Sequence, residues 1–76
     1  MQPALIPFRS YHFTMPQPAV MKVLRIIHDN EIDFFIESVT DDEKHLTLSL
    51  SVNLGKGYQR SAVTQIEGLL AISAQP

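Results

Sequence analysis

The chain has 76 residues and a mass of 8.6 kDa, contains no cysteine and no tryptophan, and carries a formal net charge of −2. Its length fits one small domain, and the missing cysteines exclude disulfides and thiolate metal sites, so we expect it to gain stability from association with other chains. The 6 basic and 8 acidic residues argue against general nucleic-acid binding, and no apolar run approaches the roughly 20 residues of a membrane span. Residues 1–8 contain two prolines and no basic residue, unlike a signal peptide, and we expect a soluble cytoplasmic protein.

The N-terminal part of the chain predicts a lead-in segment, a strand and a helix. Residues 1–8 are the lead-in, and residues 9–76 are expected to form a single domain. Apolar and polar residues alternate from Arg9 to Met15, which is typical of a strand, and the prolines that follow end it. Apolar residues then recur at helical spacing, so we expect an amphipathic helix over residues 18–29 with Pro18 in its first turn.

The rest of the chain predicts a hairpin, a second helix and a short last strand. Residues 32–40 alternate between apolar and polar, and residues 46–54 do so strictly, with a four-residue polar turn between the two strands. After a glycine-containing break, helical spacing of apolar residues predicts a helix over 58–70. Ile72 and Ala74 predict a short final strand.

The predicted order β-α-β-β-α-β is that of the ferredoxin-like split βαβ fold, of the α+β class. Right-handed crossovers would place both helices on one face of a four-stranded antiparallel sheet, with the first and third strands central. The predicted core consists of Phe13, Met15, Val20, Leu24, Ile27, Phe34, Ile36, Leu48, Leu50, Val52, Ile66 and Leu69. The uncovered face carries His12, Thr14, Asp33, Phe35, Thr47, Ser49 and Ser51.

The sequence predicts no catalytic residue, no metal site and no cofactor in this chain. Its histidines lie on three different predicted elements without metal-ligand spacing: His12, His28 and His45. Seven of the eight acidic residues lie between Asp29 and Glu43, where we interpret them as a solvated rim. Ser49 and Ser51 lie near His12 on the open face, but no orienting residue or oxyanion hole accompanies them.

Four segments resemble the ACT domain family: Val23–Ile27, Ile36–Thr40 with a two-residue shift, Leu48–Val52 and Gln65–Leu70. Over residues 9–74 the chain is similar, more narrowly, to the short regulatory subunits of acetolactate synthase of the isozyme-II kind. This resemblance implies a non-catalytic regulatory subunit that binds and activates a large thiamine-diphosphate-dependent enzyme of branched-chain amino-acid biosynthesis.

The resemblance also indicates where an amino acid would bind. The candidate ligand site is the first strand–helix loop: Met15, Pro16, Gln17, Pro18 and Ala19. Valine-responsive relatives have an Asn and a Gly in this loop, which align with Met15 and Pro18. Because Pro18 removes an amide donor and adds bulk, we expect weak or absent valine binding.

The predicted partners are other protein chains. We expect a homodimer or higher oligomer, formed by pairing edge strands or packing first helices, docked on the large catalytic subunit of acetolactate synthase. The candidate interface residues are Ala19, Met21, Ile26 and Phe35. Two alternatives stay open, a stand-alone ACT-like amino-acid sensor and a ligand-free ferredoxin-like adaptor, and nucleic acid and membranes are not expected as partners.

Overall fold

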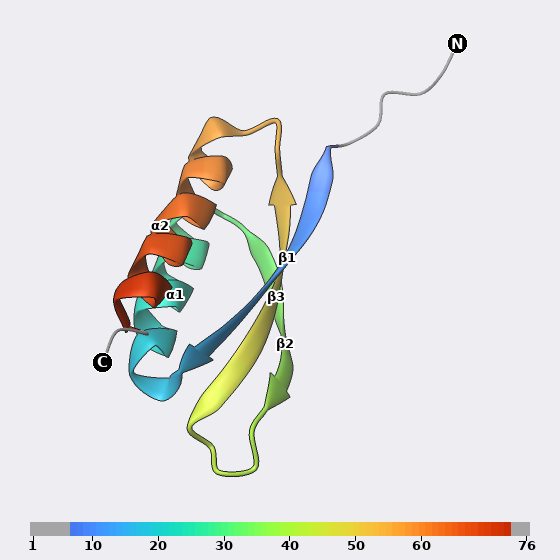
Figure 1. The fold of residues 1–76 in the computed structure, drawn as a ribbon. Helices are drawn as coiled ribbons and strands as arrows, with labels where there is room; N and C mark the ends of the chain where they lie inside the picture. The colour runs from blue at the N-terminus through green and yellow to red at the C-terminus, as the bar shows by residue number, and fades with distance from the viewer. Residues whose placement is uncertain (1–6, 74–76) are drawn as a thin grey trace.

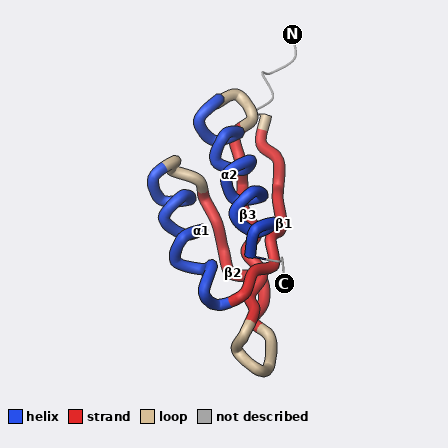
Figure 2. Tube along the Cα trace, turned by 60° about the vertical axis from the view of Figure 1, so that its left-hand side comes forward, coloured by secondary structure: helices blue, strands red, loops and turns tan. Residues whose placement is uncertain are grey.

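The computed structural model describes residues 7–73, so residues 1–6 of the predicted lead-in lie outside it. In chain order the elements are β1 (Phe8–Pro16), α1 (Gln17–Asp29), β2 (Asp33–Val39), β3 (His45–Asn53) and α2 (Gly57–Ser73). The strands form one antiparallel sheet in the order β1-β3-β2, and both helices cover the same face of that sheet (Figure 1). The helices lie side by side, with α1 nearer β2 and α2 nearer β1 (Figure 2).

The predicted four-stranded βαββαβ sheet is wrong, because residues 7–73 contain three strands. Ile72 of the predicted final strand lies in α2, and Ala74 lies outside the described residues. The helix continues past its predicted end with Ala71 and Ile72 exposed, so an alternation of two residues does not define a strand here. As a result β1, predicted to be central, lies at an edge of the described sheet, and β3 alone is central.

The two edge strands pair differently with β3. β1 pairs along its full length, from Phe8 opposite Asn53 to Pro16 opposite His45. β2 is shorter, and a bulge at Glu37 shifts its register. A bulge of this kind leaves the extra residue, Glu37, without a partner in the strand register and increases the local twist of β2.

The core lies between the helices and the covered face of the sheet. Its buried hydrophobic residues are Met15, Ala19, Val23, Ile27, Ile32, Leu48, Leu50, Val52, Ala62, Val63 and Ile66. Six of the predicted core residues are among them, and four more pack half-buried against them: Phe13, Val20, Leu24 and Leu69. The prediction of burial is wrong for the other two, Phe34 and Ile36, whose exposed fractions are 45% and 59%. All seven residues of β2 are exposed, whereas the buried stripe of α1, Ala19, Val23 and Ile27, belongs to this core.

The C-terminal end of α1 adopts a Schellman motif. The N–H of Glu31 donates to the carbonyl oxygen of His28 at 3.2 Å, and the N–H of Ile32 donates to that of Ile27 at 3.0 Å. Glu31 has a φ of 56°, in the left-handed region where this motif usually has glycine. The buried side chains of Ile27 and Ile32 supply the hydrophobic contact that accompanies the motif, so apolar packing holds a non-glycine residue in this conformation.

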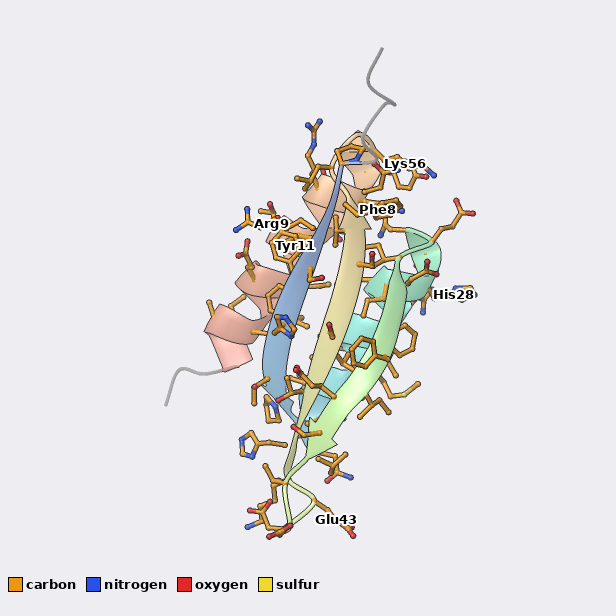
Figure 3. All side chains as sticks on the ribbon, turned by 90° about the vertical axis from the view of Figure 1, so that its right-hand side faces the viewer. Phe8, Arg9, Tyr11, His28, Glu43 and Lys56 are labelled. Atoms are coloured by element: carbon orange, nitrogen blue, oxygen red, sulfur yellow. The ribbon has the colours of Figure 1, made fainter. Side chains whose placement is uncertain are left out.

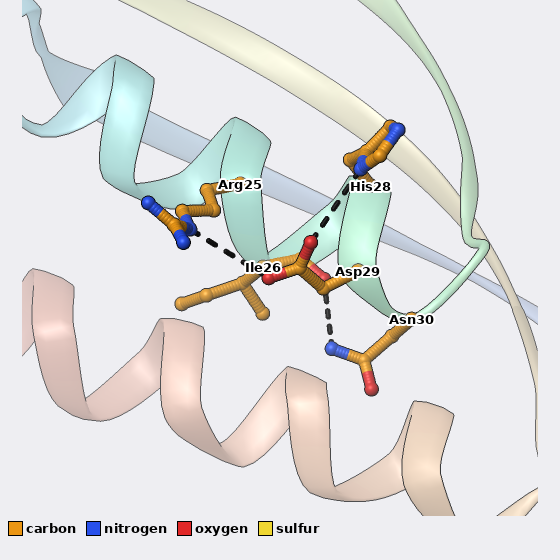
Figure 4. A network of polar contacts seen from close by, with 5 residues as sticks. All are labelled: Arg25, Ile26, His28, Asp29 and Asn30. Atoms are coloured by element: carbon orange, nitrogen blue, oxygen red, sulfur yellow. Dashed lines mark hydrogen bonds and ion pairs between the residues drawn. The ribbon is translucent and has the colours of Figure 1, made fainter.

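Polar side chains surround the last turn of α1 (Figure 4). The Asn30 side-chain amide donates to the carbonyl oxygen of Ile26 at 2.8 Å, and the backbone N–H of Asn30 donates to the same oxygen at 3.2 Å. Asp29 lies 3.7 Å from the Arg25 Nε and 3.5 Å from the His28 Nδ1. These three side chains are largely exposed, so solvent screens their interactions and they contribute little to stability.

Gln59, in the first turn of α2, is a buried polar residue with an exposed fraction of 4%. Its Oε1 accepts a hydrogen bond from the backbone N–H of Asn53 at 2.8 Å. Its Nε2 donates to the carbonyl oxygens of Asn30 and Glu31 at 3.3 and 3.2 Å. One side chain therefore joins the end of β3, the end of α1 and the start of α2.

We expect Gln59→Ala to lower the free energy of unfolding by about 1–3 kcal/mol, because it leaves a buried N–H and two carbonyl oxygens without their partner. The measurement is chemical denaturation followed by circular dichroism. Gln65→Ala, an exposed position on the same helix, is the matched control and should change stability by less than about 0.5 kcal/mol. Equal losses in the two variants would contradict the role assigned to Gln59.

Gly68→Ala should stabilise the chain by up to about 1 kcal/mol, because alanine is the better helix former and an added Cβ at this position meets no atom within 4 Å. The same denaturation experiment measures the gain. Gly55→Ala is the control, since its Cβ would lie 3.1 Å from the Asn53 Oδ1 and no gain is expected there. A neutral or destabilising Gly68→Ala would argue against a continuous helix over Gly57–Ser73.

Candidate functional site

The predicted ligand residues lie where β1 passes directly into α1, with no loop between them. β1 ends at Pro16 and α1 begins at Gln17. Met15 and Ala19 are buried, with exposed fractions of 0% and 3%, and both belong to the core. Gln17 and Pro18 are exposed and Pro16 is half-buried, so the five residues do not share one accessible surface.

The start of α1 offers few backbone donors to an anion. Pro16 and Pro18 have no N–H, and the N–H of Gln17 donates to the carbonyl oxygen of Lys44 at 2.8 Å. No side-chain hydrogen bond of residues 7–73 caps this end of the helix. Because free N–H groups at a helix start are what hold a ligand carboxylate, this junction is poorly equipped to bind an amino acid through its carboxylate.

The turn between β2 and β3 lies beside this junction and is held by its own polar groups. The Thr40 hydroxyl and the backbone N–H of Lys44 both donate to the carboxylate of Asp42, and these hydrogen bonds lower the pKa of Asp42. Glu43 has a φ of 60°, and its N–H donates to the carbonyl oxygen of Thr40 at 2.9 Å. The turn therefore has a defined shape, and the Gln17–Lys44 hydrogen bond fixes it against the start of α1.

A cavity of about 330 Å³ lies between the first turns of α1 and this hairpin. It is lined by Gln17, Val20, Met21, Val39, Glu43, Lys44, His45 and Leu46. Gln17 is the one predicted ligand residue on its wall. The lining combines apolar side chains with an acidic and a basic residue, a composition that suits a small ligand with an apolar part and a charged part.

The face of the sheet that carries no helix holds a polar cluster that crosses all three strands (Figure 3). The His12 Nδ1 lies 3.0 Å from the Glu37 Oε2, a contact between the two edge strands that the sequence did not reveal. Ser49 is opposite His12 in the strand register and has an exposed fraction of 5%.

This cluster does not form a nucleophilic site. Among the described residues no hydrogen bond joins Ser49 to His12, and the backbone of β3 is committed to pairing with strands on both sides. An acyl-transfer site needs a serine activated by its base and free N–H groups for the oxyanion. The contact between His12 and Glu37 therefore links β1 and β2 across β3.

The residues predicted for a dimer interface lie in different environments. Ala19 is buried in the core of its own chain, and Ile26 is half-buried against that core. Met21 and Phe35 are exposed, with exposed fractions of 73% and 61%. Met21 lies on α1 and Phe35 on the open face of β2.

A larger apolar surface lies along β2 and the adjoining side of α1. We call it the β2–α1 surface, and its members are Met21, Phe34, Ile36 and Val39, with exposed fractions of 73%, 45%, 59% and 53%. Phe34 and Ile36 stand opposite buried leucines of β3, so they lie on the helix side of the sheet without being covered. Met21 and Val39 line the cavity beside the hairpin and connect the two elements.

Within residues 7–73 no group of three or more histidine and acidic side chains is arranged to hold a metal ion. The acidic residues from Asp29 to Glu43 are spread over the last residue of α1, β2 and the turns at the two ends of β2. Neither helix of this part of the chain combines the length and the apolar character needed to cross a membrane.

No protein-family model, curated protein or solved structure matches this chain. The resemblance to the ACT domain family therefore stays a prediction that rests on the segments identified in the sequence. The geometry of the junction, the hairpin and the β2–α1 surface is the evidence on which a function is proposed.

Sequence reasoning missed the contribution of the hairpin to the candidate site. Glu43, Lys44 and His45 are on the cavity wall, although they are 26 or more positions from Gln17 in the sequence. The available signal was the strand pairing itself, because β1 is antiparallel to β3 and its end must therefore lie beside the start of β3. The polar residues of this turn had indicated only contact with solvent.

We expect valine, leucine and isoleucine at millimolar concentration to leave the melting temperature of the chain unchanged, because the start of α1 lacks the free N–H groups that bind a carboxylate. Thermal shift and calorimetry measure this directly. Glycine serves as the control ligand, since it has the same charged groups without an apolar side chain. Micromolar affinity for valine would contradict the prediction.

Proposed function

We propose that this chain is a non-catalytic regulatory small subunit of acetolactate synthase that binds and activates the large thiamine-diphosphate-dependent subunit, with weak or no valine feedback. The observation that carries the proposal is the β2–α1 surface, which exposes three large apolar side chains of the edge strand β2 and Met21 of α1. Contiguous exposed apolar surface of this kind marks a protein-interaction site. The ACT-like segments indicate which kind of partner to test.

The charges around the β2–α1 surface support docking on another protein. Asp33 and Glu37 lie on β2 itself, and Asp41 to Glu43 follow in the hairpin turn. An apolar strip bordered by carboxylates fits a partner surface that is apolar at its centre and basic at its margin. The edge of β2 also has backbone groups that a strand of the partner can pair with.

The first five elements and the β1-β3-β2 order agree with the arrangement that the resemblance implies. The family's fourth strand would lie beside β1, and none of residues 7–73 occupies that position. The cavity between α1 and the hairpin is the one feature that favours the alternative of an amino-acid sensor. The ligand titration described above separates the two functions.

The test is co-expression of the chain with the large acetolactate synthase subunit of the same genome. We expect the two chains to elute together and acetolactate formation per large subunit to rise several-fold. The double variant Met21→Ser, Ile36→Ser should weaken the complex at least about 10-fold, because it removes two exposed apolar side chains from the centre of the surface.

The matched control is Ile72→Ser, which removes a side chain with the same 73% exposed fraction as Met21, but on α2. It should leave complex formation unchanged. Absence of a complex and of any activation by the unmodified chain would refute the proposed function. An equal loss in Ile72→Ser would place the docking surface elsewhere on the molecule.

A further inference from the structure

We propose that the open face of the sheet binds the guanidinium group of an arginine side chain presented by a partner protein, in a hollow beside Asp33 and Phe35. The hollow has a volume of about 130 Å³, and residues of all three strands line it. It lies on the face seen in Figure 3, whereas Phe34 and Ile36 of the β2–α1 surface lie on the helix side. The site and its test therefore do not depend on the proposed function.

The hollow results from the sizes of side chains that lie opposite each other in the strand register. Opposite residues share a face of the sheet, and two rows cross the open face here. One row consists of Ser10, Ser51 and Asp33, and the next consists of His12, Ser49 and Phe35. In both rows the central strand contributes a serine, and in the second row that serine lies between two rings. The small side chains of β3 thus leave a depression between larger side chains of the edge strands.

The hydroxyl of Ser49 is available to a ligand. The hydrogen bonds between side chains on this face join His12 to Glu37 and Thr14 to Thr47, so they leave Ser49 out. Ser49 has an exposed fraction of 5%, yet no side-chain oxygen of the described residues is both fully buried and without a hydrogen bond. Its hydroxyl therefore opens into the hollow that it lines. A nearly buried hydroxyl without a protein partner favours the binding of a group that hydrogen-bonds to it.

The carboxylate of Asp33 gives the hollow a negative charge. Within residues 7–73 no ion pair involves Asp33, and no basic side chain lines the hollow. Arg9 of β1 lies on the helix side, where its guanidinium group is 5.1 Å from the centre of the Tyr11 ring. A cation from outside the chain is therefore the group that suits this carboxylate.

The ring of Phe35 favours a planar cation. Phe35 is exposed and lies two residues from Asp33 on the same face of β2. A guanidinium group donates two parallel hydrogen bonds to a carboxylate and stacks on an aromatic ring, whereas an ammonium group is compact and strongly hydrated. The N–H groups that remain have the serine hydroxyls as acceptors.

The size of the hollow indicates a side chain as the source of this group. Sites that enclose a whole small molecule commonly have about 300–1,000 Å³, which is larger than this hollow. No helix of the described residues covers the open face, so the surface of another protein can approach it. An arginine at the surface of such a partner would insert only its terminal group.

The test is a nuclear magnetic resonance titration of the full chain, labelled with nitrogen-15, with arginine blocked at both ends as its N-acetyl methylamide. We expect saturable shifts of the amide signals of Ser49, Ser51 and Phe35, with a dissociation constant in the millimolar range. Blocked citrulline has nearly the same shape without the charge and should bind at least about 10-fold more weakly. Blocked lysine should bind about 3-fold more weakly or less, because it cannot stack or form the paired hydrogen bonds.

Two variants test the residues assigned to the site. Asp33→Asn should weaken binding of blocked arginine at least about 10-fold, and Phe35→Leu about 3-fold. Asp41→Asn is the matched control, because it removes an exposed carboxylate from the turn after β2, outside the hollow, and should leave binding unchanged. Circular dichroism verifies the folding of each variant.

Three results would overturn the proposal. Equal binding of blocked arginine and blocked citrulline would exclude a site for a cation, and unchanged binding in Asp33→Asn would place the site elsewhere. Free arginine that binds at least about 10-fold more tightly than blocked arginine would make the free amino acid the ligand in place of a partner's side chain. If Asp33→Asn fails to fold, the comparison of ligands on the unmodified chain still decides.

Discussion

The strict alternation of β3 is the constraint on which the rest of the structure depends. β3 is the one strand of the described sheet with neighbours on both sides, and Leu48, Leu50 and Val52 on its covered face have exposed fractions of 1% or less. Both helices pack over this apolar row. The residues that alternate with it, Thr47, Ser49 and Ser51, are small and polar and lie on the open face. A shift of one residue in the register would exchange the two faces and remove the core.

Elements with strong periodicity could be predicted, and those that depend on their neighbours could not. The alternation of β3 and the helical spacing of α1 have their physical cause within the segment, so both elements lie within a residue or two of their expected bounds. Ile72 was misassigned because two alternating positions carry less information than the continuing contacts of Leu69 and Leu70. Phe34 and Ile36 alternate like core residues, but burial depends on what covers a strand, and sequence periodicity does not report that.

In the candidate site, too, some features follow from the residue types and others depend on the assembled fold. The poor anion-binding capacity of the first helix start follows from Pro16 and Pro18, whose missing N–H groups are a property of the residue type. The contact between His12 and Glu37 joins the two edge strands across β3, so it depends on the strand order and register, which the alternation within each segment does not report. Gln59 was overlooked because a polar residue in a helical pattern is normally assigned to solvent, and only the assembled fold surrounds it with backbone partners.

The three hydrogen bonds of Gln59 have a consequence for how the chain folds. Its acceptors on Asn30 and Glu31 are 29 and 28 positions away in the sequence, so they reach their donor only after α1 and β3 have closed around the intervening hairpin. A partly assembled chain would expose these backbone groups to water, and an assembled chain without α2 would bury them without partners. Intermediates in which only the sheet or only the helices are formed are therefore less stable. This favours a folding transition in which sheet and helices form together.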